Sequence, residues 1–311
     1  MENITFTPSV LMLNFGELTS LKYLYCVLVL IGYILIVILN GMVIITVAQH
    51  KSLQEPMYIF ISVLCINALY GSSAFYPSLL VNLLRNIQSI SYPVCLIQIF
   101  CIHSYGVCEI SILASMAYDR YVSICNPLRY NKIMTSSTVF KLILASWLYP
   151  IIIIGGVVGL TARLPLCDNN ILKFYCDNWS VVRLSCVDTT INNIYGLGIT
   201  AVGLGLIPLM IFYSYIKIFR VCIKSSVEVK QKALQTCTPH LITLTNFLID
   251  TLFEILIHRF APAKLPYELR VIMSLQFLVV PPILNPLIYG LKMKEIKKKV
   301  KELMLAKPRT I

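Results

Sequence analysis

The chain has 311 residues, of which 58% are hydrophobic and only 13% are charged, and its mean hydropathy is +0.79. Soluble domains are roughly half apolar and about a quarter charged, so this composition excludes a water-facing globule. Glycine (13) and proline (15) occur at ordinary frequencies, which excludes collagen-like and disordered low-complexity chains. The composition predicts an all-α membrane protein that crosses the bilayer several times.

The formal net charge of +12 raises the question of nucleic-acid binding. The basic residues, however, lie between and after long apolar runs rather than on one face of a soluble module. This distribution is typical of the positive-inside bias of membrane proteins. We therefore expect the lipid bilayer, and no nucleic acid, as a partner.

Seven apolar stretches are long enough to span a membrane, which takes about 20 residues at a rise of about 1.5 Å each. No linker or internal repeat divides the chain, so these stretches are expected to form one unit. We expect an extracellular N-terminus at 1–22, a seven-helix bundle at 23–290 and a cytoplasmic amphipathic helix and tail at 291–311. The expected spans are approximately 23–48, 57–83, 93–124, 139–160, 193–221, 235–258 and 268–290.

Lysine and arginine predict the orientation, because they concentrate on the cytoplasmic side. With the N-terminus outside, eighteen of the 26 basic residues lie in cytoplasmic segments and eight lie outside. Residues 1–20 lack a basic segment followed by a uniform apolar core, so the first helix is expected to act as an uncleaved signal. We expect a multi-pass plasma-membrane protein. Asn3 and Asn178 begin acceptor sequons in outer segments and are the candidate glycosylation sites.

Four of the 11 cysteines fall on the expected outer face: Cys95, Cys167, Cys176 and Cys186. In an oxidising compartment four thiols permit three pairings. A zinc site is the alternative, but the chain has only 4 histidines and none lies in this loop. Two disulfide bonds are therefore favoured, with their pairing left open. The other seven cysteines lie in or beside spans, where they are expected to pack as small apolar residues.

Several strings of residues, in chain order, form a recognisable signature. They are Leu39-Asn40-Gly41, Pro56-Met57-Tyr58-Ile59-Phe60, MAYDRYVSICNPLRY at 116–130, Ser214-Tyr215, KALQTCTPHL at 232–241 and Asn285-Pro286-Leu287-Ile288-Tyr289. With these strings the chain resembles the rhodopsin-like (class A) G-protein-coupled receptors and, among them, the odorant (olfactory) receptors. The strings at 116–130 and 232–241 point to the odorant receptors specifically.

This resemblance implies two disulfides, Cys95–Cys176 and Cys167–Cys186, which tie the long outer loop to the third helix and hold it as a lid over a pocket. It also implies an activation switch at the inner end of that helix. The residues alone leave Arg120 either paired with a neighbour or snorkelling at the interface.

By resemblance, Asp119, Arg120 and Tyr121 form the switch. When the sixth helix moves outward, the released Arg120 meets a heterotrimeric G protein and is supported by Tyr215 and Tyr289. The resemblance implies a stimulatory, cAMP-raising G protein.

Asn285 and Pro286 interrupt the hydrogen-bond ladder of the last helix, because proline has no N–H donor. The freed carbonyl groups and Asn285 then need water or Asn40 as partners. The use of this kink as a hinge is implied by the resemblance.

Glu109 is expected about 16 Å deeper in the membrane than Arg120, where a lone carboxylate costs about 3 kcal/mol unless it is paired, hydrated or protonated. A protonated or water-bound Glu109 is favoured. By resemblance, an acid at this position can also hold a sodium ion. Many relatives carry an aspartate in helix two at the position of Ala68, next to Asn67, and its absence removes one anionic ligand. No other metal and no cofactor are expected.

The inward faces of helices three, five, six and seven predict a largely apolar pocket with a few polar points, which suits a small, partly apolar molecule. Asp250 and Glu254 lie on one face of helix six, and Glu254 is the better candidate for ligand contact, with water or pairing to His258 or Arg259 as the alternative. The expected lining is His103, Gly106, Val107, Ile110, Ile199, Thr200, Gly203, Leu248, Thr251, Glu254, Ile255, Val271, Leu275 and Leu278.

Ile296, Val300, Leu303 and Met304 form an apolar stripe opposite lysines, which predicts a helix lying on the inner membrane surface. Together the features predict an odorant receptor, not an enzyme, that couples a small-molecule odorant to a G protein. One alternative is the same fold with a non-odorant ligand, although helix three has no aspartate near His103 to hold an amine. The other is a transporter, which would show repeats or charged helices lining a path.

Overall fold

The computed structural model describes residues 8–15, 22–260 and 267–305. Within these ranges it does not describe the side chains of 229, 232, 254–260, 267–274, 291–292, 294 and 303–305.

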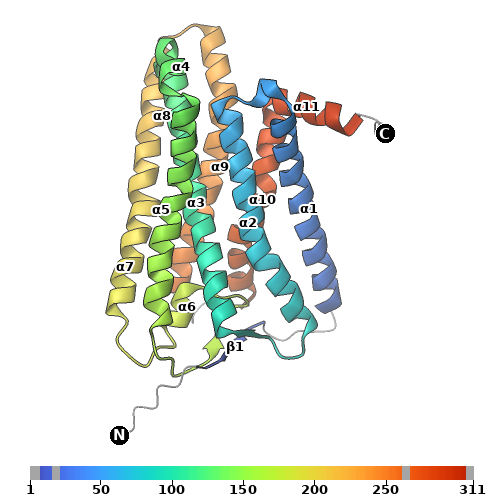
Figure 1. The fold of residues 1–311 in the computed structure, drawn as a ribbon, viewed down its shortest axis with the longest axis vertical. Helices are drawn as coiled ribbons and strands as arrows, with labels where there is room; N and C mark the ends of the chain where they lie inside the picture. The colour runs from blue at the N-terminus through green and yellow to red at the C-terminus, as the bar shows by residue number, and fades with distance from the viewer. Residues whose placement is uncertain (1–7, 16–21, 261–266, 306–311) are drawn as a thin grey trace.

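Long helices run side by side along the whole molecule (Figure 1). Each of the seven expected spans lies inside one helix or, for the fifth span, inside a helix pair joined by a π-helical turn at Val202–Leu206. The helices are α1 (Lys22–Gln49), α2 (Pro56–Leu84), α3 (Tyr92–Cys125), α5 (Ser136–Ala162), α7 (Thr190–Ala201) with α8 (Ile207–Ile223), α9 (Val227–Phe260) and α10 (Tyr267–Lys292).

The starts of these helices follow from their local sequence. Pro56 occupies the first turn of α2, where its missing N–H costs no hydrogen bond. The side chain of Thr135 accepts a hydrogen bond from the backbone N–H of Thr138 at 3.3 Å and so caps α5.

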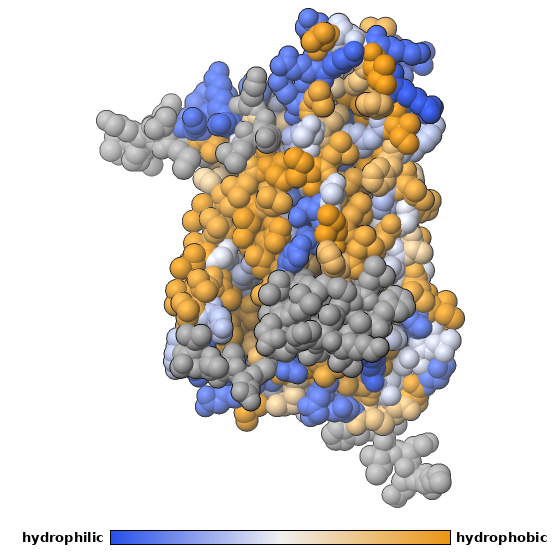
Figure 2. Space-filling view, turned by 180° about the vertical axis from the view of Figure 1, so that it is seen from behind, coloured by the Kyte–Doolittle hydropathy of each residue, from blue (hydrophilic) through white to orange (hydrophobic). Residues whose placement is uncertain are grey.

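The surface of the bundle is apolar around its middle. Figure 2 shows this band between hydrophilic ends. In α1, 28 residues long, only Ile36, Asn40, Val43, Thr46 and Val47 are buried, so most of its apolar side chains face outward. Such a surface is stable only against lipid. Within the described residues, five helices are each long and apolar enough to cross a bilayer. They are α1, α2, α3, α5 and the α7–α8 pair.

α11 (Lys294–Leu305) leaves the bundle beside α1 (Figure 1). It is bent by 93° from α10, as expected of a helix that lies along a membrane surface. Ile296 is fully buried against the core and Val300 is partly buried. Leu303 and Met304, the rest of the expected stripe, have side chains outside the description.

A small sheet closes the end of the bundle that is expected to face outside, and no pattern in the sequence predicted it. Strand β1 (Val10–Leu13) pairs antiparallel with β2 (Ser89–Ser91) and parallel with β3 (Asn170–Ile171). The N-terminal segment therefore fastens two outer loops to each other. Short strands of this kind escape sequence patterns because tertiary partners, not local periodicity, hold them.

Candidate functional site

A cavity of about 220 Å³ lies between α3, α5, α7 and the π-helical turn, α9, α10 and the long outer loop. Its wall is mostly apolar. The described lining residues are Ile102, His103, Gly106, Val107, Ile110, Ile154, Val157, Lys173, Tyr175, Asp177, Asn178, Trp179, Asn192, Gly196, Ile199, Thr200, Gly203, Leu204, Phe247, Thr251 and Phe277.

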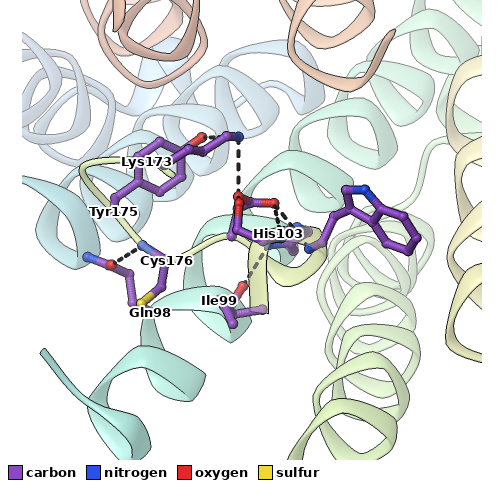
Figure 3. A network of polar contacts seen from close by, with 9 residues as sticks. Gln98, Ile99, His103, Lys173, Tyr175 and Cys176 are labelled. Carbon is purple, nitrogen blue, oxygen red and sulfur yellow. Dashed lines mark hydrogen bonds and ion pairs between the residues drawn. The ribbon is translucent and has the colours of Figure 1, made fainter. Parts of the chain in front are cut away.

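The outer loop covers the cavity and is fixed to α3 by covalent and polar bonds. Cys176 forms a disulfide with Cys95, at a Cα–Cα distance of 5.5 Å. The backbone N–H of Cys176 also donates to Oε1 of Gln98 at 2.9 Å. Figure 3 shows this loop lying across Gln98, Ile99 and His103 of α3. A second disulfide, Cys167–Cys186, closes the loop on itself. Both pairings are those that the resemblance implied.

Two buried charges of opposite sign lie in the loop above the cavity. Nζ of Lys173 is 3.4 Å from Oδ2 of Asp177. The same ammonium donates to the hydroxyl of Tyr175 at 3.4 Å and lies 5.1 Å from the centre of its ring. Asp177 also caps the short helix α6 (Asn178–Val182) by accepting the backbone N–H groups of Trp179 and Ser180.

Glu109 is fully buried at the centre of the bundle, below the cavity. Its Oε2 accepts a hydrogen bond from Nδ2 of Asn67 at 2.8 Å, and its Oε1 accepts one from Nδ2 of Asn285 at 2.7 Å. Two neutral amides on α2 and α10 therefore satisfy the carboxyl group. Asn285 was expected to contact water or Asn40, and its partner is Glu109 instead. The polar helix-two residue that faces Glu109 is Asn67, not the neighbouring Ala68.

The buried amide oxygens of Asn67 and Asn285 accept no hydrogen bond from the described residues. Oxygen atoms of this kind, like those of the Glu109 carboxyl group, are hard ligands that water or a hard cation can satisfy. Within the described residues, no group of three or more His, Cys, Asp or Glu side chains is close enough to hold a metal.

A side chain of α1 hydrogen-bonds the carbonyl group that a proline leaves unpaired in α10. Pro286 has no N–H to offer the carbonyl of Pro282 four residues earlier. Nδ2 of Asn40 donates to that carbonyl at 2.8 Å, which fulfils the expectation that a freed carbonyl needs Asn40. The kinked helix is thereby stabilised by the asparagine of the Leu39-Asn40-Gly41 string.

The inner end of α3 carries a closed cluster of charged and polar groups. Asp119 is fully buried, and its Oδ2 accepts hydrogen bonds from the guanidinium of Arg120, with Nε at 2.9 Å. Its Oδ1 accepts the hydroxyl of Tyr130, in α4 (Tyr130–Ile133), at 2.8 Å. Burial and the charge of Asp119 raise the pKa of Tyr130 above its ordinary value, so its hydroxyl keeps the proton that it donates. Arg120 is thus held by its neighbour in this structure.

A second contact ties α9 to two other helices. Nε2 of His240 lies 2.9 Å from the carbonyl of Leu113 on α3, and its Nδ1 lies 2.7 Å from the hydroxyl of Tyr215 on α8. Because a carbonyl only accepts, Nε2 carries a proton and donates it. The fully buried His240 therefore joins α9 to α3 and α8 at the inner half of the bundle.

Comparison with known proteins identifies the family. The family model for olfactory receptors matches residues 27–307. Human olfactory receptor 52D1 is 34% identical over 274 residues, which is 88% of this chain and 86% of that receptor. Human olfactory receptor 51I2 is 37% identical over 263 residues, covering 84% of each. The chain belongs to the olfactory receptor family. It is therefore a multi-pass membrane receptor of the G-protein-coupled class and not an enzyme.

The fold of this olfactory receptor is that of rhodopsin. The crystal structure of squid rhodopsin superimposes with a TM-score of 0.74 over 93% of this chain and 82% of that one, at 18% sequence identity. The match confirms the expected seven-helix bundle.

Eight of the residues expected to line the pocket of the receptor do line the cavity: His103, Gly106, Val107, Ile110, Ile199, Thr200, Gly203 and Thr251. Leu248, Leu275 and Leu278 are not among the described lining residues. Leu278 is buried and the other two pack partly buried against the core. On α9 the cavity is lined by Phe247 and Thr251, so Phe247 takes the place that was expected for Leu248. Glu254, Ile255 and Val271 have side chains outside the described part of the receptor.

The remaining predicted residues are placed as follows. Tyr121 is partly buried against the core and Tyr289 is fully buried on α10. Asn178 lines the cavity, and its Oδ1 accepts the hydroxyl of Thr161 at 2.7 Å. Asn3 lies outside the described residues. Asp250 does not line the cavity and accepts hydrogen bonds from Asn246 at 2.9 Å and Gln276 at 2.6 Å.

Sequence reasoning missed the roles of Lys173, Asp177, His240 and Asn67. His240 stands in the string at 232–241, so its place in a signature was a usable signal. Lys173 and Asp177 have i, i+4 spacing but lie in a loop, where spacing predicts no contact. Only the folded loop brings them over the cavity.

Proposed function

We propose that this olfactory receptor binds a small extracellular odorant in the cavity beneath the disulfide-bonded loop and activates a heterotrimeric G protein at its inner face. The expected partner is the stimulatory, cAMP-raising G protein. The observation that carries this proposal is the arrangement of α3, which lines the cavity with His103, Gly106 and Val107 and ends in the held Arg120. One continuous helix, α3, thus connects the covered cavity to the residue proposed as the switch.

In this mechanism the ligand favours a state in which α9 has moved away from α3. The bonds of His240 to Leu113 and Tyr215 would break, and Arg120 would become available to the G protein. A ligand drives such a change only by binding the active state more tightly. Raising the active population from about 1% to about 99% takes roughly 5.5 kcal/mol of preference.

The proposal includes the plasma membrane as location, with the N-terminus outside and the C-terminus in the cytoplasm. The excess of basic residues in the inner segments supports this orientation. An epitope tag at the N-terminus should be accessible on intact cells, whereas a tag at the C-terminus should require permeabilised cells. Accessibility of both tags from the same face would contradict the orientation.

The function is tested by applying an odorant panel to cells that express the chain and measuring cAMP. We expect at least one compound to raise cAMP, and Arg120→Gln to abolish that response at equal surface expression. Arg129→Gln is the matched control, because Arg129 is an exposed basic residue nearby and should lose much less. A response through calcium instead of cAMP would correct the G protein alone. Uptake of compounds without any G-protein response would favour a carrier.

A further inference from the structure

The charge on the cavity wall indicates which ligands the cavity accepts. Of the described lining residues, Lys173 and Asp177 carry full charges of opposite sign. Both are buried, with exposed fractions of 7% and 9%. The other described lining residues are apolar or neutral polar, apart from the imidazole of His103, whose Nδ1 lies 3.0 Å from the carbonyl of Ile99.

Each of the two charges is satisfied inside the loop. The ammonium of Lys173 has the carboxylate of Asp177 at 3.4 Å and the hydroxyl and ring of Tyr175 as partners. The carboxylate of Asp177 in turn accepts two backbone N–H groups and the hydroxyl of Ser180. The two charges cancel at short range, so together they leave neither a net positive nor a net negative wall.

A charged ligand would be at a disadvantage in such a site. It would give up its hydration and meet no uncompensated opposite charge, and pairing with one member of the loop pair would leave the other buried and unpaired. An uncharged ligand carries neither penalty. Its apolar part matches the apolar wall, and a hydroxyl group can donate to the oxygen atoms of Thr200 and Thr251, whose own protons go to backbone carbonyls.

We propose that the cavity selects uncharged, partly apolar small molecules with a hydrogen-bonding group, and that the Lys173–Asp177 pair excludes acids and amines. This inference rests on the proposed function, because it names the chemical class of ligand for the same cavity. The two residues are specificity-determining: each neutralises the charge that the other would offer to a ligand.

The wild-type test uses ligands that differ only in charge. Hexanol, methyl hexanoate, hexanoate and hexylamine, with their butyl to decyl homologues, are added to the full-length receptor in lipid nanodiscs, and the thermal unfolding temperature is measured. We expect the alcohol and the ester to raise it and the two ions to leave it unchanged. Gly203→Leu controls for partition into lipid, because the added side chain enters open space beside the cavity and should remove only the specific shift.

Substitutions in the pair should change the preference in opposite directions. Asp177→Asn keeps an equally good cap on α6 but leaves Lys173 uncompensated, so the affinity for hexanoate should rise by roughly tenfold or more. Lys173→Met leaves Asp177 uncompensated and should favour hexylamine by a similar factor. The double variant should again prefer the neutral compounds, and Lys173→Arg, which keeps both charges, should behave as wild type.

Wild-type binding of hexanoate or hexylamine at least as strong as that of hexanol would overturn the inference, as would failure of every homologue to bind. Single variants that fold and keep the wild-type preference would also overturn it. If the single variants fail to fold, the wild-type series still decides. Because unfolding needs no G protein, a neutral ligand that binds without any G-protein response, through cAMP or through calcium, refutes the proposed function alone. A cAMP response to charged ligands only refutes this inference alone.

Discussion

The outer and inner halves of the receptor are held together by different kinds of bond. In the outer half, two disulfides and a three-stranded sheet fix the loop over a cavity. In the inner half, the described residues are joined by side-chain hydrogen bonds, such as those of Asp119 and His240. Covalent bonds keep the outer half in one arrangement, whereas hydrogen bonds of about 1 kcal/mol each can exchange partners.

This difference matches what a signalling protein requires of its two ends. The site that recognises a molecule gains affinity from being preorganised, because less ordering is needed on binding. The end that changes state must have two arrangements of similar free energy. Four predictions examine the two halves, and they are given in order of decreasing expected effect.

The largest effect is expected from removing the bond between the loop and α3. Cys95→Ser should reduce surface expression strongly, because loss of a native disulfide typically costs about 2–5 kcal/mol. Surface labelling and thermal unfolding measure the loss. Cys26→Ser is the matched control, since Cys26 is a half-buried free cysteine. Equal surface expression of the two variants would show that the covalent tie is dispensable.

The next effect is expected where Gly71 of α2 packs against Tyr105 of α3. A Cβ added at Gly71 would lie 2.5 Å from Cγ of Tyr105, whose ring is fully buried. Gly71→Ala should therefore lower the free energy of unfolding by about 1–3 kcal/mol. In the matched variant Gly41→Ala the added Cβ meets nothing within 4 Å. Gly41→Ala should keep or raise the unfolding temperature, and a Gly71→Ala receptor as stable as this control would contradict the packing argument.

A smaller effect, on signalling rather than folding, is expected at the contact between α9 and α3. Because Arg120 is paired with Asp119 here, we take the bonds of His240 to hold the silent arrangement. His240→Leu removes two bonds worth about 1 kcal/mol each, so the ratio of active to inactive receptor without ligand should rise by roughly thirtyfold. Basal cAMP per surface receptor is the measurement. Ser214→Ala, whose hydroxyl bonds only within its own helix at Met210, should leave it unchanged. Basal cAMP at or below the wild-type value would refute the assignment.

The smallest effect concerns the two glycosylation candidates. The side chain of Asn178 lines the cavity and its amide oxygen is bonded to Thr161, so this sequon should carry no glycan. Asn178→Gln should leave the electrophoretic mobility unchanged. Asn3→Gln should increase mobility as glycan is lost, and digestion with a glycosidase provides the reference. A mobility shift from Asn178→Gln alone would contradict the cavity placement.

Local sequence was enough to predict the class of the protein and the positions of its membrane-spanning helices. Runs of about 20 apolar residues have few alternatives to a helix in a bilayer, because every backbone group must be bonded within the segment. The spans and the four cysteines expected outside follow from local composition, and short strings predict a switch at Arg120. Each of these features depends on residues that are close together in the chain, so the printed sequence is enough to predict it.

Contacts between groups far apart in the sequence could be seen only in the folded receptor. Asn285 bonds Glu109 rather than Asn40, and α9 turns Phe247 rather than Leu248 toward the cavity. The N-terminal strand pairs with two distant loops: Met12 lies opposite Ser89, 77 residues away, and opposite Asn170, 158 residues away. Helix rotation and loop conformation are set by packing among several elements at once. For that reason the ion pair of Lys173 and Asp177 above the cavity becomes visible only in the folded receptor.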